Sequence, residues 1–382
     1  MDQSRLCAGK IFILLYDAVG LDIEISVKAF FGPHDFYVEN NMSDERFIDY
    51  WKENEEEQII NLSLRPQSLE EFLGQKNVTS ALRISIEAAK QRNEPLEHLL
   101  LAGPPGLGKT SLAYCIAHQM GAKITATSGP AIERAGDLVG ILTNLELGDI
   151  LFIDEIHRLS RVIEEFLYPA MENFQIDFVI DKGPYAKTVK FNLKPFTLIG
   201  ATTRKGLLSA PLRGRFGLFF DFDFYTPEEL SEIVKRSAQL LEVKIDDESS
   251  LEIAKRSRGS PRLSNRLLKR VRDYAQVLGK GVIDIGITQK SLEKIGVDKQ
   301  GLDEMDRKYL SAIINLHKGG PAGIEAIAAS LSEDRLTLED VIEPYLLKEG
   351  FIIRTPRGRV ATEISYRHLN IPYPKELQNK LF

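Results

Sequence analysis

The rhythm of hydrophobic and polar positions changes several times along the chain. Between residues 21 and 28, apolar and polar side chains alternate as in a half-buried strand. From Leu64 onward, short apolar runs alternate with stretches of helical periodicity, a pattern typical of a parallel sheet with functional loops at the carboxyl ends of its strands. The predicted strands are His98–Ala102, Lys123–Thr127, Ile150–Ile153, Phe196–Gly200 and Leu218–Phe224.

A mainly helical region follows the predicted sheet. Thr226 is a good N-cap, Pro227 suits the first turn of a helix, and Glu229 stands where a capping-box acid is expected. These signals predict a helix that starts at this point and a helical region that continues to about Val297.

The C-terminal region combines three helical patterns with two short strand-like pieces. The predicted helices cover residues 304–317, 324–331 and 337–348, and the two strand-like pieces flank the turn Thr355-Pro356-Arg357-Gly358. Three helices and a hairpin are the parts of a winged helix-turn-helix. The sequence therefore predicts an N-terminal extension without recognisable chemistry over 1–61, an α/β domain over 62–226, a small helical domain over 227–297 and a winged helix-turn-helix over 298–382.

Composition limits the partners of this protein. Its 382 residues are 43% hydrophobic and 27% charged, with a formal net charge of -6. Any contact with nucleic acid must therefore be local, and the arginine-rich stretch "RTPRGR" is one candidate. Cys7 and Cys115 stand far apart without metal-ligand spacing, so neither a disulfide framework nor a zinc site is expected. The apolar run Ile11–Tyr16 is too short for a signal peptide or a membrane span, and we expect a cytoplasmic protein.

The stretch "GPPGLGKTS", residues 103–111, fits the phosphate-loop pattern G-x-x-x-x-G-K-T and follows a predicted strand. Glycines let backbone N–H groups close around a polyphosphate at a helix N-terminus. Lys109 would reach the β and γ phosphates, and the Thr110 hydroxyl would bind a magnesium ion. The sequence therefore predicts a site for ATP and Mg²⁺ that includes Gly106, Gly108, Lys109, Thr110 and Ser111.

Acidic and hydroxyl side chains follow two further predicted strands. In "ILFIDE", four apolar residues precede Asp154 and Glu155. Asp154 would hold the magnesium ion through water, and Glu155 would orient and deprotonate the attacking water. Thr202 and Thr203 follow "FTLIGA" and could bind the γ-phosphate or that water, although a strand-end N-cap is an alternative.

Three arginines are candidates for contacts with a nucleotide. "PLRGRF" carries Arg213 and Arg215, either of which could stabilise the γ-phosphate of a neighbouring subunit, or form a surface salt bridge instead. A finger supplied to a neighbour implies a ring. Arg262 stands in the first helical turn after Ser260 and Pro261, where the helix dipole disfavours a cation, and this position suggests an anionic partner such as the nucleotide.

In this order the motifs resemble the RuvB family of ATP-driven Holliday junction motors. The resemblance covers Leu64 to Asn370, whereas the first 61 residues match nothing in that family. The phosphate loop, the acid motif or the arginine motif alone would indicate only an AAA+ ATPase. The stretches that carry the resemblance are "GPPGLGKT", "TSGPAIERAGDL", "LFIDEIHRL", "PFTLIGATTR", "APLRGRFG", "RGSPR", "NRLLKRVRDYA", "GLDEMDRK", "EPYLLKEGF" and "RTPRGR".

The resemblance implies a P-loop AAA+ domain with a parallel sheet, a small helical lid domain and a C-terminal winged helix-turn-helix. It implies a homohexameric ring around double-stranded DNA at Holliday junctions, with a RuvA-type partner and a RuvC-type resolvase in the same pathway. The β-rich stretch 176–193, which predicts a hairpin, would dock on the RuvA-type partner. The resemblance favours Arg215 as the finger, and it adds nucleotide contacts from Leu64, Arg65 and Tyr225 and from the segment Glu172, Asn173 and Phe174.

The same resemblance places "RTPRGR" at the tip of the wing. Pro356 and Gly358 would shape the turn, and Arg354 and Arg359, with Arg357 between them, would reach the DNA backbone or minor groove. Phosphate contacts are independent of base sequence, as a motor that moves along any DNA requires.

Two alternatives remain at this point. One is a clamp-loader or protein-remodelling AAA+ ATPase, although neither a cysteine-ligated zinc motif nor an aromatic pore loop is evident in the sequence. The other is a winged-helix regulator that uses ATP only as a switch. Glu155 argues against the regulator, because a switch that need not turn over has little use for a catalytic base.

Overall fold

The computed structural model describes residues 62–180 and 187–374, with side chains described outside 178–189. All of these residues fall within one unit of the chain, residues 54–382. The predicted N-terminal extension, the turn of the predicted hairpin and residues 375–382 lie outside the described residues.

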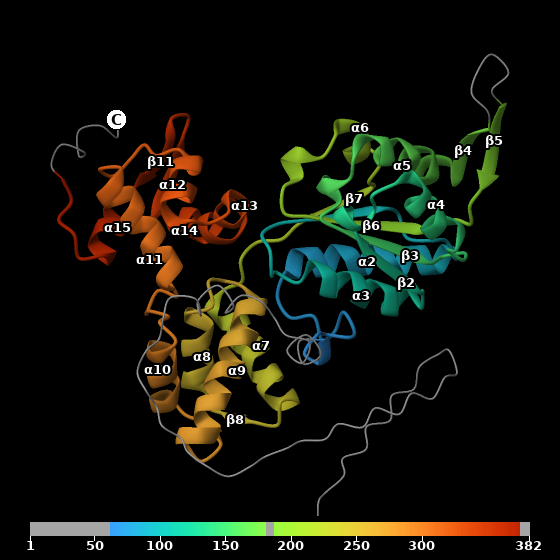
Figure 1. Cartoon of the computed structure of the whole chain (residues 1–382). Helices are drawn as coiled ribbons and strands as arrows, with labels where there is room; N and C mark the ends of the chain where they lie inside the picture. The colour runs from blue at the N-terminus through green and yellow to red at the C-terminus, as the bar shows by residue number, and fades with distance from the viewer. Residues whose placement is uncertain (1–61, 181–186, 375–382) are drawn as a thin grey trace, which may run out of the picture. The chain divides into compact units, whose positions relative to one another are not determined.

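The central sheet has five parallel strands in the order β2, β3, β6, β1, β7 (Figure 1). Strands β1, β3 and β6 are buried along almost their whole length, because helices cover both faces of a parallel sheet. Each strand lies where an apolar run predicted it, although β7 ends at Asp221 rather than Phe224. The strands are β1 (Leu99–Ala102), β2 (Ile124–Ser128), β3 (Ile150–Asp154), β6 (Thr197–Thr202) and β7 (Leu218–Asp221).

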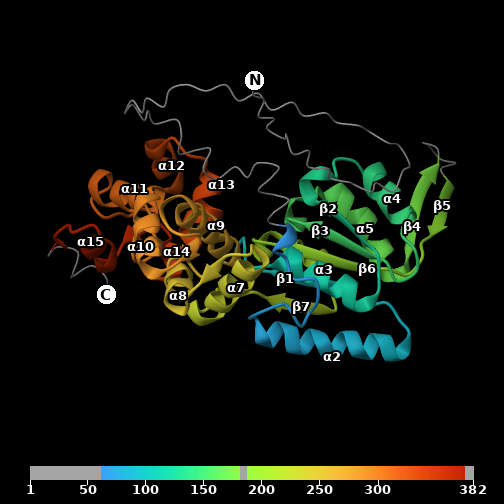
Figure 2. The same ribbon diagram turned by 90° about the horizontal axis from the view of Figure 1, so that it is seen from below.

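Two hydrophobic cores lie on opposite faces of this sheet (Figure 2). Successive residues of β1 point to opposite faces, so Leu99 joins the core under helices α2 and α3, and Leu100 joins the core under α4 and α5. The helices and 3₁₀ turns of this domain are α2 (Lys76–Arg92), α3 (Lys109–Met120), η3 (Gly129–Ala131), α4 (Ala135–Thr143), η4 (Ile156–Arg158), α5 (Arg161–Asn173), η5 (Lys205–Leu207) and α6 (Ala210–Arg213).

The strand order places three functional segments side by side. Strand β6 lies between β3 and β1, and all three run parallel. The phosphate loop follows β1, the acid pair ends β3, and Thr203 follows β6. Parallel strands present their carboxyl ends at one edge of a sheet, so these segments meet at one edge.

Strands β4 (Gln175–Ile180) and β5 (Lys187–Asn192) form an antiparallel hairpin that leaves the domain after α5 (Figure 1). This confirms the hairpin predicted over 176–193. Its turn, and the side chains of most of its length, lie outside the described residues.

The small helical domain begins at the predicted cap. The Thr226 hydroxyl accepts a hydrogen bond from the Glu229 N–H at 3.2 Å, and the Glu229 carboxylate accepts one from the Thr226 N–H at 3.0 Å. This reciprocal pair is the capping box that the sequence predicted. The domain contains α7 (Pro227–Leu240), β8 (Lys244–Ile245), α8 (Asp247–Lys255), α9 (Pro261–Leu278), β9 (Val282–Ile283) and α10 (Ile285–Lys294).

The C-terminal domain has the predicted three helices followed by a hairpin. Its third helical stretch starts at Arg335 instead of residue 337, because the Asp334 carboxylate caps the Thr337 N–H at 3.1 Å. Gly358 has φ +137°, and a Cβ there would collide with the Ala322 backbone, so the wing requires glycine at this position. The elements are α11 (Glu304–Ser311), the π-helical turn η6 (Ala312–Leu316), α12 (Ile324–Leu331), α13 (Arg335–Thr337), the π-helical turn η7 (Leu338–Ile342), α14 (Glu343–Lys348), β10 (Ile352–Thr355), β11 (Gly358–Ala361) and α15 (Glu363–His368).

Within residues 62–180 and 187–374, none of the helices is long and apolar enough to cross a bilayer.

Candidate functional site

The phosphate loop is shaped by glycines and by a buried lysine. Gly103, Gly106 and Gly108 all have positive φ, a region that is open to glycine at little steric cost. The Lys109 ammonium donates hydrogen bonds to the backbone carbonyls of Gly103 and Pro104, each at 2.8 Å. The side chain of Lys109 therefore lies back along the loop that precedes it, at the N-terminus of α3.

The environment of Lys109 is unfavourable for its charge. Burial is the main reason that the pKa of Lys109 falls to about 8, and the nearby carboxylates of Asp154 and Glu155 offset part of this effect. Carbonyl oxygens carry only partial charges, so the loop keeps a net positive charge when Lys109 is protonated. An anionic phosphate is the kind of ligand that this charge would stabilise.

Tyr225, just before the small helical domain, and two residues at the start of α9 touch the same loop. The Tyr225 hydroxyl donates a hydrogen bond to the Leu107 carbonyl at 3.2 Å. The Ser260 hydroxyl and the Arg262 N–H both donate to the Gly106 carbonyl at 3.3 Å. Tyr225 and Arg262, two predicted nucleotide contacts, are thus placed beside the phosphate loop.

The other residues predicted to contact the nucleotide lie in the first turn of α3 and in the segment before α2. Thr110 and Ser111 occupy the first turn of α3, directly after Lys109, and both are partly buried. Leu64 is buried, and its carbonyl accepts a hydrogen bond from Arg236 at 3.0 Å. The Arg65 guanidinium stands 6.0 Å from the centroid of the Tyr114 ring. Contact of Leu64 and Arg65 with a nucleotide stays a prediction.

The acid pair at the end of β3 meets Thr203 at the end of β6. The Thr203 hydroxyl donates a hydrogen bond to Glu155 Oε2 at 3.1 Å. Asp154 Oδ1 accepts one from the Glu155 N–H at 2.9 Å. Glu155 has φ +48°, an uncommon value for a residue with a side chain, and such backbone conformations cluster at functional sites. The Thr203 hydroxyl therefore contacts the carboxylate of Glu155, the predicted catalytic base.

Sequence reasoning missed two residues at this edge of the sheet. The His157 Nδ1 atom lies 3.1 Å from Glu155 Oε2 and 2.9 Å from the Thr202 hydroxyl. Arg204 donates hydrogen bonds to Asp340 at 2.6 Å and to Glu339 at 3.3 Å. His157 stands two residues after Glu155 in the sequence, but a single histidine offers no pattern that would have identified it.

Arg215 lies beside the C-terminal end of helix α5. Its guanidinium forms an ion pair with Glu172 at 3.0 Å, stacks 4.3 Å from the centroid of the Tyr168 ring and donates a hydrogen bond to the Pro211 carbonyl at 2.7 Å. Its Nε atom is buried without a partner among the described residues. Arg213 is exposed, and its side chain forms no hydrogen bond or ion pair within the described part of the chain.

The segment Glu172 to Phe174, which was predicted to contact the nucleotide, begins beside Arg215. Glu172 forms the ion pair with the guanidinium, Asn173 is exposed at the last position of α5, and Phe174 follows with φ +51°. Phe174 packs edge-on against Phe196, with ring centroids 5.8 Å apart. Contact of this segment with a nucleotide stays a prediction.

In the wing, two of the three predicted DNA contacts are already paired with acids. Arg359 donates hydrogen bonds to Glu343 Oε1 at 2.7 Å and to Glu339 Oε1 at 3.1 Å, and its side chain is only 14% exposed. Arg354 donates to Glu343 Oε2 at 2.8 Å and stays half exposed. Arg357 is exposed and forms no ion pair with any described residue. DNA contact by all three stays a prediction, and Arg357 differs from the other two in having no acidic partner among the described residues.

Glu343 is the centre of this charge cluster. It is fully buried at the start of α14, and the Tyr309 hydroxyl also donates to its Oε1 atom at 2.5 Å. Burial alone would raise the pKa of Glu343, but hydrogen bonds from Arg359, Tyr309 and Arg354 hold this pKa below its usual value. The carboxylate therefore stays ionised inside the domain and binds the wing to α14.

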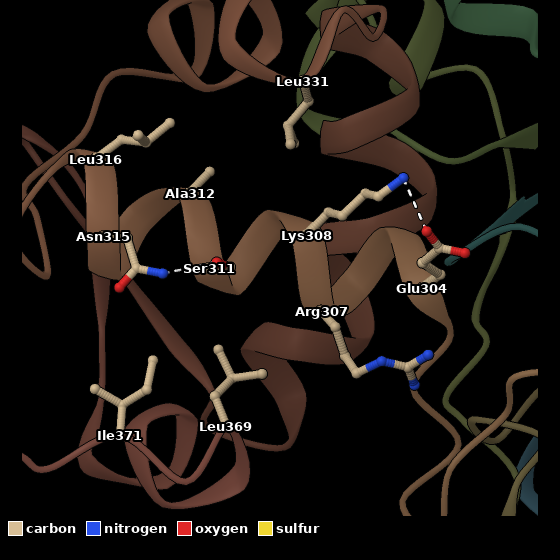
Figure 3. Close-up of a pocket in the computed structure, with 10 residues that line it drawn as sticks. All are labelled: Glu304, Arg307, Lys308, Ser311, Ala312, Asn315, Leu316, Leu331, Leu369 and Ile371. Atoms are coloured by element: carbon tan, nitrogen blue, oxygen red, sulfur yellow. Dashed lines mark hydrogen bonds and ion pairs between the residues drawn. The ribbon is translucent and has the colours of Figure 1, made fainter. Parts of the chain in front are cut away.

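The winged-helix domain also has a groove of about 620 Å³ along α11 and η6 (Figure 3). One wall carries an ion pair between Lys308 and Glu304 at 2.9 Å, and the rest of the lining mixes polar and apolar side chains. The predicted nucleotide and DNA contacts are not among its lining residues, which are Glu304, Arg307, Lys308, Ser311, Ala312, Asn315, Leu316, Leu331, Leu369 and Ile371.

Comparison with known families covers most of the chain. The family model for the Holliday junction DNA helicase RuvB P-loop domain matches residues 64–222. The RuvB AAA lid domain matches 225–298, and the RuvB C-terminal winged helix domain matches 299–370. The matches follow one another in the order that the sequence motifs predicted.

Individual relatives agree with these matches. The Holliday junction branch migration complex subunit RuvB of Kosmotoga olearia is 58% identical over 328 residues, which cover 86% of this chain and 95% of the relative. The solved structure of the Thermotoga maritima RuvB Holliday junction branch migration motor is 52% identical with a TM-score of 0.76, and covers 82% of this chain and 100% of its own. A mutant of that protein is 53% identical with a TM-score of 0.76, and covers 81% of this chain and 99% of its own. The predicted resemblance is confirmed, and the chain belongs to the RuvB family.

Proposed function

We propose that this protein hydrolyses ATP to drive branch migration of Holliday junctions. The observation that carries the proposal is the meeting of Lys109, Glu155 and Thr203 at one edge of the sheet, in a chain that also has a winged-helix domain. Membership of the RuvB family selects this function over the clamp-loader and regulator alternatives.

The side chains at this edge suit a phosphoryl transfer to water. Lys109 would bind the β and γ phosphates, and Thr203 would hold Glu155 while Glu155 accepts a proton from the attacking water. The Thr110 hydroxyl and the Asp154 carboxylate are oxygen donors of the kind that Mg²⁺ prefers, and they would hold that ion. When bound, magnesium would neutralise phosphate charge.

Assembly into a homohexamer completes the proposed site. Arg215 and the segment of Glu172, Asn173 and Phe174 form one group at the end of α5, and this group would act on the nucleotide of the next subunit. An arginine supplied in trans stabilises the charge of the transition state and links hydrolysis to ring closure. The ring would surround double-stranded DNA, which Arg354, Arg357 and Arg359 of the wing would contact.

The hairpin of β4 and β5 is the feature that favours a protein partner. Its two strands leave the domain as an isolated pair, and isolated two-stranded hairpins gain stability when another surface covers them. We assign this hairpin to a RuvA-type junction-binding protein, and a RuvC-type resolvase would act in the same pathway. The relative from Kosmotoga olearia is named as a subunit of a branch migration complex.

The decisive experiment is dissociation of a synthetic four-way junction with ATP and Mg²⁺, with and without a RuvA-type partner. Glu155→Gln serves as the blank, because it keeps the shape of the side chain and removes the base. We expect junctions to dissociate with the unsubstituted protein and not with the variant. ATP hydrolysis without junction movement under every condition would retain the ATPase and reject the junction substrate.

A further inference from the structure

His157 lies beside the predicted base, and the proposed mechanism does not use it. It lies on η4, the 3₁₀ turn after β3, and its side chain is only 7% exposed. Its Nδ1 atom is within hydrogen-bond distance of two oxygens, Glu155 Oε2 at 3.1 Å and Thr202 Oγ1 at 2.9 Å.

These two contacts determine which ring nitrogen carries the proton. An ionised carboxylate can only accept hydrogen bonds, so the contact with Glu155 requires a proton on Nδ1. The Thr202 hydroxyl can accept a hydrogen bond from the same N–H. It also accepts a hydrogen bond from the Arg204 backbone N–H at 3.0 Å. Burial is the main cause that lowers the pKa of His157, so the ring is neutral at pH 7 and has a single N–H, on Nδ1.

The two carboxylate oxygens of Glu155 consequently have different polar contacts. Oε2 accepts a hydrogen bond from Thr203 at 3.1 Å and lies 3.1 Å from His157 Nδ1. Oε1 has no hydrogen-bond partner among the described residues, and the side chain is 32% exposed. The two polar contacts at Oε2 orient the carboxylate and leave the second oxygen available.

We propose that His157 is a positioning residue that holds Glu155 through Oε2, so that Oε1 can take the proton of the attacking water. This inference rests on the proposed ATP hydrolysis. In that step the water oxygen bonds to the γ-phosphorus, the bond from the γ-phosphorus to the bridging oxygen of ADP breaks, and the proton goes to Oε1. His157 contacts neither the nucleotide nor the water.

Three substitutions of His157 test the role of its Nδ1 atom. The amide nitrogen of asparagine can take the place of Nδ1, and that of glutamine the place of Nε2. Leucine fills a similar volume without a donor. We expect His157→Gln and His157→Leu to lower kcat for ATP about 10- to 150-fold, the effect of one lost polar contact with a charged group. His157→Asn should retain at least about half of kcat, and KM should stay within about twofold in all three variants.

A double-mutant cycle then tests whether His157 acts through Glu155. In a Glu155→Gln background, His157→Leu should change the residual rate less than about twofold, because the carboxylate that it positions is gone. A structural role of His157 would lower the rate in both backgrounds. Thermal unfolding of each variant reports on folding, and the Asn and Gln pair remains informative if the Leu variant does not fold.

Two outcomes overturn the inference. One is an equal loss of kcat in His157→Asn and His157→Gln, which would mean that the position of the donor is irrelevant. The other is a rise in KM without a change in kcat. Both differ from failure of the proposed function, in which the unsubstituted protein itself would not hydrolyse ATP more rapidly than Glu155→Gln.

Discussion

Lys109 in the phosphate loop and Arg359 in the wing are both nearly buried cations, but their charges are balanced in different ways. Lys109 is held by two backbone carbonyls, and burial lowers its pKa to about 8. For Arg359, burial opposes the charge, but hydrogen bonds and charge from Glu343 outweigh it and raise the pKa. Carbonyls leave a full positive charge for an incoming anion, whereas carboxylates neutralise it.

This difference separates cations that bind ligands from cations that maintain the fold. We propose that Lys109 belongs to the first kind, whereas Arg359 supports the fold through Glu343 in addition to its proposed contact with DNA. Arg357 is exposed and has no ion pair among the described residues. Like the charge of Lys109, its charge is not neutralised by a paired carboxylate. Four experiments would break or sharpen the comparison.

The largest effect is expected from Lys109→Ala. Each hydrogen bond from a charged group to phosphate contributes about 1.5–3 kcal/mol, so loss of two should weaken MgATP binding by at least about a hundredfold. Isothermal titration calorimetry with ATP and Mg²⁺ measures this, and Glu155→Gln, which should bind ATP normally, is the control. Equal ATP affinity in Lys109→Ala and the unsubstituted protein would remove the whole catalytic assignment.

Glu343→Gln should destabilise the winged-helix domain. It leaves Arg359 buried with less compensating charge and brings amide protons against arginine and tyrosine donors, at a cost of about 3 kcal/mol. Urea unfolding of the full chain measures this, with the exposed Glu349→Gln on the same helical stretch as the control. Since the pKa of Glu343 is lowered by folding, its contribution is present above the ordinary carboxyl pKa and disappears as pH falls through the folded pKa.

The affinity for ATP should depend on pH through Lys109. Its pKa of about 8 means that the free protein binds phosphate best below pH 8, and affinity decreases as pH rises through this value. One-proton linkage gives a decrease of about tenfold between pH 7 and pH 9. Titrations with a non-hydrolysable ATP analogue avoid turnover and keep Glu155, whose charge contributes to the pKa of Lys109. A constant dissociation constant across this range would show that Lys109 stays charged and that the carbonyls balance it better than we infer.

The smallest effects concern the wing. Arg357→Ala should weaken binding of duplex DNA about three- to tenfold and reduce the salt dependence by about one phosphate contact, with unchanged stability. Arg359→Ala should instead lower the free energy of unfolding. Fluorescence anisotropy at several salt concentrations, with urea unfolding of both variants, distinguishes the two. The opposite result would mean that Glu343 releases Arg359 when DNA binds.

Most of the fold could be predicted, because apolar runs such as 150–153 and caps such as Thr226 act over short distances in the sequence. The phosphate loop and acid pair were found for the same reason. The pairing of Arg359 with Glu343 could not be predicted, since it depends on how a helix and a hairpin 16 residues apart pack together. His157 was missed because a single histidine offers no pattern in the sequence, and its contact with Thr202 joins two different strands of the sheet.

The ladder of the wing places Arg354 directly opposite Arg359. Two like charges in such a cross-strand pair would push the strands apart. Glu343 accepts hydrogen bonds from both, so the repulsion becomes an attachment of each strand to α14. We infer that this attachment stiffens the wing, so that a force applied at its tip would pass into the domain with little bending. Low compliance of this kind would suit a motor that moves DNA.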